Sequence, residues 1–232
     1  MTKEEEKRLI SRVEDQIKSK IIDVKMPPQG MDSNVFFVTD INKKDYVIKQ
    51  SENSICDVIA YKLLEENKIE IPVPKVFGYF EFEGKTVVIL EKVNFALLES
   101  IPDIEMGKYI PSMIVNLKKI HQVKSERAGL LTDDNEKRNW KEILLAIFDG
   151  TNIDWEEVSK RDGVDGEIIK SSVKKMMEKI NNVDLIESSY SLLHTDFNQR
   201  NLFVNTENDQ IASIIDWGEA MFGDPIYDFG RV

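Results

Sequence analysis

The chain has 232 residues, of which 41% are hydrophobic and 31% charged, enough to bury a sizeable core in one globule or in two packed lobes. Its net charge of -11 argues against nucleic-acid binding, which requires a basic patch, and suits a cationic small molecule instead. The single cysteine, Cys56, excludes an intrachain disulfide and a zinc site built from cysteines.

The sequence contains no segment that resembles a membrane anchor or a signal peptide. No apolar run approaches the roughly 20 residues that span a bilayer. The N-terminus, MTKEEEKRLI, is charged where a signal peptide has an apolar core. We therefore expect a cytoplasmic protein with no membrane partner.

The N-terminal elements begin with a capping box formed by Thr2 and Glu5. Apolar residues then recur at helical spacing, which predicts an amphipathic helix over residues 3–22. Prolines and a glycine follow, and residues 30–34 form a small polar loop. Two short runs rich in β-branched and aromatic residues, separated by a polar loop, then predict strands over 35–39 and 46–49.

The next predicted elements are a helix and two further strands. Residues 54–66 have the pattern of a helix, and two prolines within 71–76 exclude a helix there. Two strands, over 76–82 and 86–90, are joined by Glu83 and Gly84. From about residue 95 the pattern becomes helical, with helices expected over 110–120, 139–148 and 166–181.

The most informative stretch runs from His194 to Phe229. It contains His194-x-Asp196, an asparagine at 201 and an aspartate at 216 that follows an apolar strand, which is the spacing of a kinase catalytic loop and its metal-binding aspartate. Phosphoryl transfer requires a carboxylate to orient the acceptor hydroxyl and hard oxygen ligands for Mg²⁺. Asp196 fits the first role, and Asn201 and Asp216 fit the second.

Either half of this pattern alone is weak, because aspartate and asparagine are common in any surface loop. Here, however, apolar strands flank both halves: residues 190–193 lead into the loop, 202–204 leave it, and 211–215 deliver Asp216. This context favours a catalytic interpretation.

The strings HTDFNQRN, IIDWGEAMFGD and DPIYDFG resemble the catalytic segment of the aminoglycoside phosphotransferase and choline kinase group, and DWGEAMFGD is most similar to hygromycin-type phosphotransferases. The resemblance implies an α+β, protein-kinase-like bilobal fold. It places a nucleotide-binding lobe with an antiparallel sheet at residues 1–94, with the hinge at 90–94, and a mainly helical catalytic and acceptor-binding lobe at 95–232. Since members generally continue beyond the DF pair, we expect this second lobe to be short at its C-terminal end.

The resemblance also implies the nucleotide site. Lys49 would pair with the phosphates and with a carboxylate on the next helix, where Asp57 replaces the usual glutamate, so the pairing is expected to be looser or bridged by water. Ser33, Asn34 and backbone N–H groups would contact phosphate. The hinge segment with Glu91 and Val93 would bind adenine through its backbone.

The implied activity is transfer of the ATP γ-phosphate, with Mg²⁺, to a hydroxyl of a small molecule of aminoglycoside type; GTP remains an alternative donor. Glu219, Asp149 and Glu157 are candidate contacts for a cationic acceptor. His194, Asp224 and Asp228 would be structural. Two alternatives stay open: a kinase for choline, fructosamine, homoserine or methylthioribose, and a non-catalytic nucleotide-binding protein of the same fold.

Overall fold

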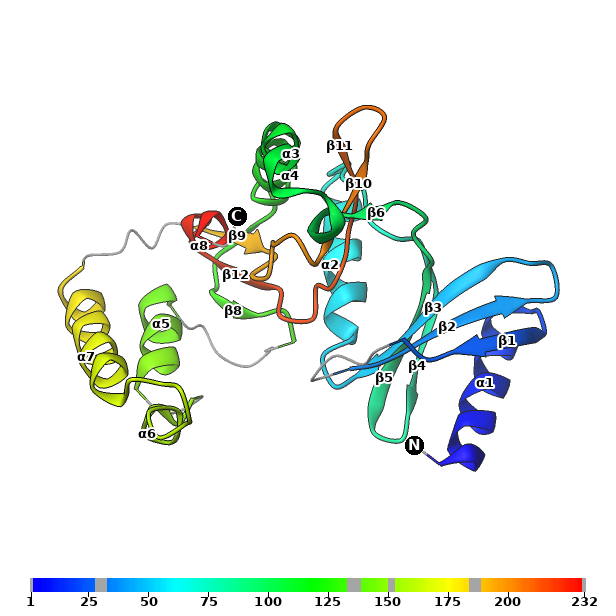
Figure 1. The fold of residues 1–232 in the computed structure, drawn as a ribbon, viewed down its shortest axis with the longest axis horizontal. Helices are drawn as coiled ribbons and strands as arrows, with labels where there is room; N and C mark the ends of the chain where they lie inside the picture. The colour runs from blue at the N-terminus through cyan, green and yellow to red at the C-terminus, as the bar shows by residue number, and fades with distance from the viewer. Residues whose placement is uncertain (1, 28–32, 133–138, 150–152, 184–188, 231–232) are drawn as a thin grey trace.

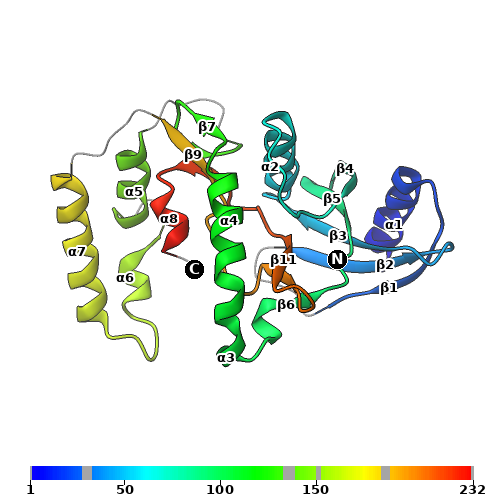
Figure 2. The ribbon, with the colours of Figure 1, turned by 90° about the horizontal axis from the view of Figure 1, so that it is seen from above.

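The computed structural model describes residues 2–27, 33–132, 139–149, 153–183 and 189–230. A five-stranded antiparallel sheet and helix α1 (Lys3–Ile17) lie at one end of the molecule (Figure 1). Helices α5 (Trp140–Phe148) and α7 (Gly166–Asn182) lie at the other end, and the segment with the predicted catalytic residues lies between the two ends (Figure 2).

The N-terminal sheet is a meander whose last two strands exchange places. Its strands are β1 (Ile21–Lys25), β2 (Asn34–Asp40), β3 (Asp45–Ser51), β4 (Val76–Phe82) and β5 (Lys85–Glu91), in the order β1-β2-β3-β5-β4. Glu83 and Gly84 both have positive φ, as a two-residue type I′ turn requires. One face of the sheet packs on α1, and Ile48 of β3 lies in this core. Lys49 therefore points to the opposite face.

Helix α1 is shorter than predicted. The expected helix over 3–22 ends at Ile17, because Lys18 adopts the left-handed conformation (φ 55°) and closes the helix without a glycine. Ile21, whose spacing matched the helical pattern, instead begins β1 and pairs with Asp40. A strand that starts with apolar residues directly after a helix prolongs the i, i+4 pattern, so periodicity alone placed the boundary wrongly.

Helix α2 (Ile55–Glu66) connects the sheet to the rest of the chain. Its Val58 packs against residues of β5, whereas Ala60 and Leu64 belong to the larger core of the C-terminal half, together with Trp217. A residue on α2 can therefore contact both halves of the molecule.

The C-terminal half contains helices and two small sheets. The remaining helices are α3 (Asp103–Met106), α4 (Ile110–Ile120), α6 (Trp155–Val158) and α8 (Ile226–Phe229), with 3₁₀ turns at Leu98–Ser100 and Gly107–Tyr109. The strands are β6 (Ala96–Leu97), β7 (Lys124–Ser125), β8 (Gly129–Leu130), β9 (Tyr190–Leu193), β10 (Leu202–Asn205), β11 (Gln210–Ile214) and β12 (Met221–Gly223). They form the sheets β11-β10-β6 and β7-β9-β12-β8.

The helices predicted over 54–66, 110–120, 139–148 and 166–181 are confirmed to within one residue at each end. Of the predicted polar loop, residues 30–32 lie outside the described residues and Ser33 lies within them. In the described part of the chain, no helix is both long enough and apolar enough to cross a membrane.

Candidate active site

A β-hairpin brings the predicted catalytic residues together. Strand β10 pairs with β11 so that Leu202 lies opposite Ile214, and the backbone N–H of Ile215 donates to the carbonyl of Asn201 at 3.0 Å. The end of β11 therefore lies next to the start of β10. Asp216, the residue after Ile215, is thereby placed near the loop that contains Asp196.

Two asparagine side chains hold the carboxylate of Asp196. Nδ2 of Asn198 donates to Oδ1 at 2.7 Å, and Nδ2 of Asn201 donates to Oδ2 at 2.8 Å. Asn201 Nδ2 also donates to the backbone oxygen of Asp196 at 2.9 Å. These neutral donors orient the carboxylate and leave its charge in place.

The buried side chain of His194 supports the same loop from the protein interior. It is fully buried, its Nε2 lies 2.9 Å from the carbonyl oxygen of Ile215, and its Nδ1 accepts from the backbone N–H of Asp196 at 3.3 Å. A carbonyl can only accept, so the ring carries its proton on Nε2 and is neutral. Burial lowers the pKa of His194 below its ordinary value, despite the nearby carboxylates. This geometry agrees with the expected structural role.

Asp228 fastens the start of the loop. Its buried carboxylate accepts from the backbone N–H of His194 at 3.0 Å and of Thr195 at 2.8 Å, and it also contacts Nε2 of His121 at 2.9 Å. These bonds to the loop backbone agree with the structural role expected of Asp228. Thr195 has a positive φ of 68°, a strained conformation for a β-branched residue, so these bonds hold the loop in a shape it would not adopt alone.

Lys49 joins two carboxylates that come from different parts of the chain. Its Nζ lies 2.8 Å from Oδ2 of Asp57 and 2.6 Å from Oδ1 of Asp216. Burial by itself would lower the pKa of Lys49, but the two carboxylates outweigh it and raise the pKa above its ordinary value. For Asp216, burial opposes and the charge of Lys49 favours ionisation, and the net result is a lowered pKa. Lys49 and Asp216 are therefore both charged at neutral pH.

The pairing of Asp57 is tighter than the sequence suggested. We expected the shorter aspartate to pair loosely or through water, but the contact with Lys49 is direct. Asp57 is fully buried, and its second oxygen accepts the backbone N–H of Trp217 at 2.8 Å. Because α2 packs into the larger core beside Trp217, the missing methylene is compensated by the position of the helix.

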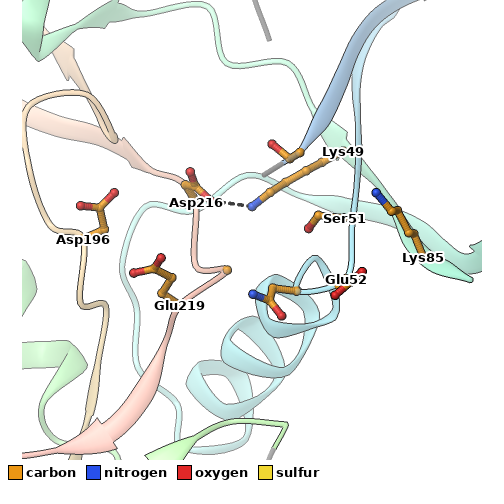
Figure 3. Close-up of a pocket in the computed structure, with 10 residues that line it drawn as sticks. Lys49, Ser51, Glu52, Lys85, Asp196, Asp216 and Glu219 are labelled. Atoms are coloured by element: carbon orange, nitrogen blue, oxygen red, sulfur yellow. Dashed lines mark hydrogen bonds and ion pairs between the residues drawn. The ribbon is translucent and has the colours of Figure 1, made fainter. Parts of the chain in front are cut away.

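Lys49, Asp196 and Asp216 face a common pocket of about 480 Å³, a size typical of small-molecule sites (Figure 3). In Figure 3, Asp196 and Glu219 lie on one side of Asp216 and Lys49, and Lys85 lies on the other. The lining residues are Ser33, Lys49, Ser51, Glu52, Asn53, Lys85, Asp196, Asp216, Gly218 and Glu219.

The model of the phosphotransferase enzyme family matches residues 23–232. The chain belongs to this family. Hygromycin-B 4-O-kinase of Escherichia coli is 24% identical over an alignment of 221 residues, and the match covers 91% of this chain and 62% of that protein. The chain thus spans less than two thirds of the length of this curated relative.

Solved structures agree on the fold. A thermostable mutant of aminoglycoside phosphotransferase APH(4)-Ia, in ternary complex with ADP and hygromycin B, matches with a TM-score of 0.73 at 18% identity, over 96% of this chain and 75% of that chain. Amicoumacin kinase hAmiN in complex with AMP-PNP, Ca²⁺ and Ami matches with a TM-score of 0.64 at 13% identity, over 98% and 68%. The predicted kinase-like fold is confirmed.

Within this member of the phosphotransferase enzyme family, some predicted site residues lie away from the pocket. The Asn34 side chain donates to Gln50 at 3.4 Å, and Ser33 alone of the two lines the pocket. Glu91 ends β5, and its carboxylate accepts from the backbone N–H of Lys75 at 3.3 Å. Neither Glu91 nor Val93 lines the pocket, so a role for the hinge depends on its backbone and stays a prediction.

The acidic residues predicted on the helical end also lie elsewhere. Asp149 caps the end of α5, and Glu157 lies on α6, where it pairs with Arg161 at 3.8 Å. Neither lines the pocket of this phosphotransferase family member, whereas Glu219 does. They were predicted because they are acidic and lie in the region that the resembling family uses for acceptor recognition, and neither property places a side chain in the pocket.

Several residues of the site were not predicted. Ser51, Glu52, Asn53 and Lys85 line the pocket, because β3 pairs with β5 and delivers both strand ends to it. Asn198, which bonds Asp196, was also missed. Its position two residues after the predicted catalytic aspartate was the available signal, but asparagine in a loop usually indicates a turn.

The donor set fits a magnesium ion. Among the described residues, no three His, Cys, Asp or Glu side chains lie together in an arrangement that could hold a metal by themselves. Asn201 and Asp216 nevertheless offer hard oxygens: the Asp216 side chain is 51% exposed, and the Asn201 amide oxygen is left over because Nδ2 faces Asp196. Mg²⁺ suits such a pair, since it takes few protein ligands and completes its shell with phosphate and water.

Proposed function

We propose that the chain is a small-molecule kinase that transfers the γ-phosphate of ATP to a hydroxyl of an aminoglycoside-type acceptor. One observation carries the proposal: Asp196, Lys49 and Asp216, which lie on separate segments, face one pocket beside Asn201. Membership of the phosphotransferase enzyme family supports the reaction class. The named activity of the E. coli relative, hygromycin-B 4-O-kinase, supports the acceptor class.

The residues divide the work of the reaction. Asp196 orients the acceptor hydroxyl and takes its proton as the oxygen bonds to the γ-phosphorus and the bond to the β-phosphate oxygen breaks, which leaves ADP. Lys49 binds phosphate oxygens while Asp57 fixes its ammonium group. Asn201 and Asp216 would hold Mg²⁺, whose charge balances the phosphate oxygens. Ser33 lies where it can contact phosphate.

A cationic acceptor fits the charge around Asp196. Glu219 lies beside Asp196 in Figure 3, and Glu52 lines the same pocket. These carboxylates can pair with the ammonium groups of an aminoglycoside. The net charge of -11 would also raise the local concentration of such a molecule.

The nucleotide is expected between the two lobes that divide at residue 94. The hinge at 90–94 would bind the adenine edge through backbone groups, which do not depend on the side chains of Glu91 and Val93. Backbone recognition of this kind also leaves GTP as an alternative donor to be tested.

Thermal unfolding with ATP or GTP, with and without Mg²⁺, tests the nucleotide part of the proposal. A nucleotide at a hundredfold excess over its Kd should stabilise the fold by about 2.7 kcal/mol. We expect a larger shift with Mg²⁺ than without it. No shift with either nucleotide would contradict a kinase function and favour a fold without phosphotransfer.

A screen of acceptors tests the second part. Phosphate transfer from ATP should occur to hygromycin B or another aminoglycoside in preference to choline, fructosamine, homoserine or methylthioribose. Glu219→Gln should raise the KM for the cationic acceptor up to about 5-fold with a smaller change in kcat, because Glu219 is exposed and an exposed charge pair contributes about 0.2–1 kcal/mol. Glu207→Gln, in an exposed turn of the same half, is the matched control. Transfer only to choline, homoserine, fructosamine or methylthioribose would contradict an aminoglycoside-type acceptor.

A further inference from the structure

Asn198 has its amide group held from two sides. Its Oδ1 accepts from the backbone N–H of Arg200 at 2.9 Å, and its Nδ2 donates to Oδ1 of Asp196 at 2.7 Å. Since a backbone N–H can only donate and a carboxylate only accept, this pair of contacts defines which end of the amide is oxygen. The backbone N–H of Asn198 also donates to the carbonyl of Asp196 at 2.9 Å. The side chain is therefore set in one orientation.

The two amides on Asp196 are not equivalent. In the proposed function Asn201 also offers its oxygen as a metal ligand, so both the cation and Asp196 determine the position of its side chain. Asn198 has no second task of this kind among the described residues. It is half-buried in the loop and holds the carboxylate oxygen that Asn201 does not reach. Without it, Asn201 holds the Asp196 carboxylate at one oxygen only, and the plane of the carboxylate is less restricted.

We propose that Asn198 is a positioning residue for Asp196: its Nδ2 fixes the plane of the carboxylate that meets the acceptor hydroxyl. This inference rests on the proposed function. Displacement of a reacting group by about 1 Å costs on the order of 100-fold in rate. Loss of the Asn198 donor should therefore lower turnover without weakening the binding of either substrate.

Replacement by aspartate separates this role from a purely structural one. In Asn198→Asp the side chain keeps its shape and can still accept the N–H of Arg200, so the turn persists, but the amide donor to Asp196 is replaced by a second carboxyl group that repels Asp196 or shares a proton with it. Asn198→Ala removes both contacts. Gln199→Ala is the matched control, because Gln199 is the exposed neighbour in the same loop.

Steady-state kinetics with the acceptor identified by the screen gives the first readout. We expect kcat to fall about 10- to 100-fold in both Asn198 variants, with KM for ATP and for the acceptor within about threefold of the wild type and with Gln199→Ala unchanged. A similar thermal shift with Mg·ATP shows that each variant is folded. Wild-type kcat in Asn198→Asp would overturn the inference, and so would an equal loss in Gln199→Ala.

A second readout does not depend on activity. The side-chain NH₂ signals of Asn198 in a ¹H–¹⁵N NMR spectrum, assigned by their loss in Asn198→Asp, should move and exchange faster with water in Asp196→Ala, whereas the amide of Gln199 should not respond. Unchanged Asn198 signals would overturn the inference. If the wild type phosphorylates no acceptor, the proposed function fails by that result, and the NMR comparison still decides whether Asn198 holds Asp196.

Discussion

The pocket contains two carboxylates that the protein holds in opposite ways. Asp196 is held by the neutral amides of Asn198 and Asn201, all within one loop of the C-terminal half. Asp216 is held by the ammonium group of Lys49, which comes from the N-terminal sheet and is itself anchored by Asp57 on α2. The first arrangement is local and leaves the charge unbalanced. The second is long-range and pairs the charge of Asp216 with a cation that it shares with Asp57.

The difference indicates what each region contributes. In the proposed function Asp196 accepts a proton, and neutral donors suit that role because they fix the direction of the carboxylate without pairing its charge. In the same proposal Asp216 meets a cation and phosphate at the junction of the two halves, where its ion pair with Lys49 joins the halves. Changes in the first region should therefore affect chemistry, and changes in the second should affect stability and nucleotide binding.

The largest effect should follow from Asp196→Ala. The variant loses the group that orients the hydroxyl and takes its proton, and we expect kcat to fall by about 10²- to 10⁴-fold. The amides of Asn198 and Asn201 can bond to water in its place, so the fold should persist. Turnover and the thermal shift with Mg·ATP measure the two quantities. Full activity would remove Asp196 from the mechanism and erase the contrast between the regions.

The next largest effect is expected from Lys49→Met. Asp57 is fully buried, and without Lys49 its charge has no partner cation in the described residues. Breaking a buried ion pair from one side typically costs about 3–5 kcal/mol. Chemical denaturation should show a loss of this order, accompanied by weak ATP binding. Lys85→Met, which alters another lysine of the same pocket, should leave stability nearly unchanged.

The double variant Lys49→Met with Asp57→Asn sharpens this result. The second substitution removes the unpaired negative charge of Asp57 and keeps a side chain of the same size, so the double variant should recover a large part of the stability lost in Lys49→Met. ATP binding should stay weak, because the phosphate-binding cation is still absent. No recovery would mean that the cost of Lys49→Met comes from packing and not from the unpaired carboxylate.

Much of the first region was predictable because it is local in sequence. Asp196, Asn201 and Asp216 lie in one stretch, and a short hairpin is enough to bring them together. Lys49 and Asp57 were predicted from the order of strand and helix. The directness of their contact was not, because it depends on how closely α2 packs into the core beside Trp217. The shortened α1 shows the same limit: the left-handed turn at Lys18 carries no glycine to announce it.

The residues that sequence reasoning missed depend on non-local pairing. Lys85 and Ser51 reach the pocket through the register between β3 and β5, which composition does not reveal. Asp149 and Glu157 were proposed for their charge, and they lie on helices whose placement depends on tertiary packing. Asn198 stood within the recognised motif, yet its role becomes visible only when its amide is seen to be held from both sides.

A smaller effect concerns the pH dependence of stability through His194. The folded state disfavours the charged ring, so the unfolded chain binds a proton more readily as pH falls through the ordinary value of 6.5. Stability is therefore present above this pH and decreases below it. Protonation would also break the bond from Asp196 N–H to Nδ1, so the amide-held region should loosen first.

Denaturation midpoints at pH 7.5, 6.5 and 5.5 measure this decrease. His194→Gln should be less stable than the wild type at pH 7.5 and should lose less stability on acidification. His121→Gln is the control, since His121 is the only other histidine of the sequence. Equal pH slopes in the wild type and in His194→Gln would show that a group other than His194 controls the acid response.

The smallest effect should come from Thr195, whose strained backbone lies directly before Asp196. Thr195→Ala keeps a Cβ at positive φ and loses the bond from Oγ1 to the carbonyl of Glu219, 3.0 Å long, so it should cost about 0.5–1.5 kcal/mol. Thr195→Gly loses the same bond but relieves about 1–2 kcal/mol of strain, against about 0.5–1 kcal/mol of extra chain entropy. Urea denaturation should then find the glycine variant at least as stable as the alanine variant. Should glycine be clearly the less stable, the loop would not be under strain, and the local region would hold Asp196 by its own preference and not by the bonds to Asp228.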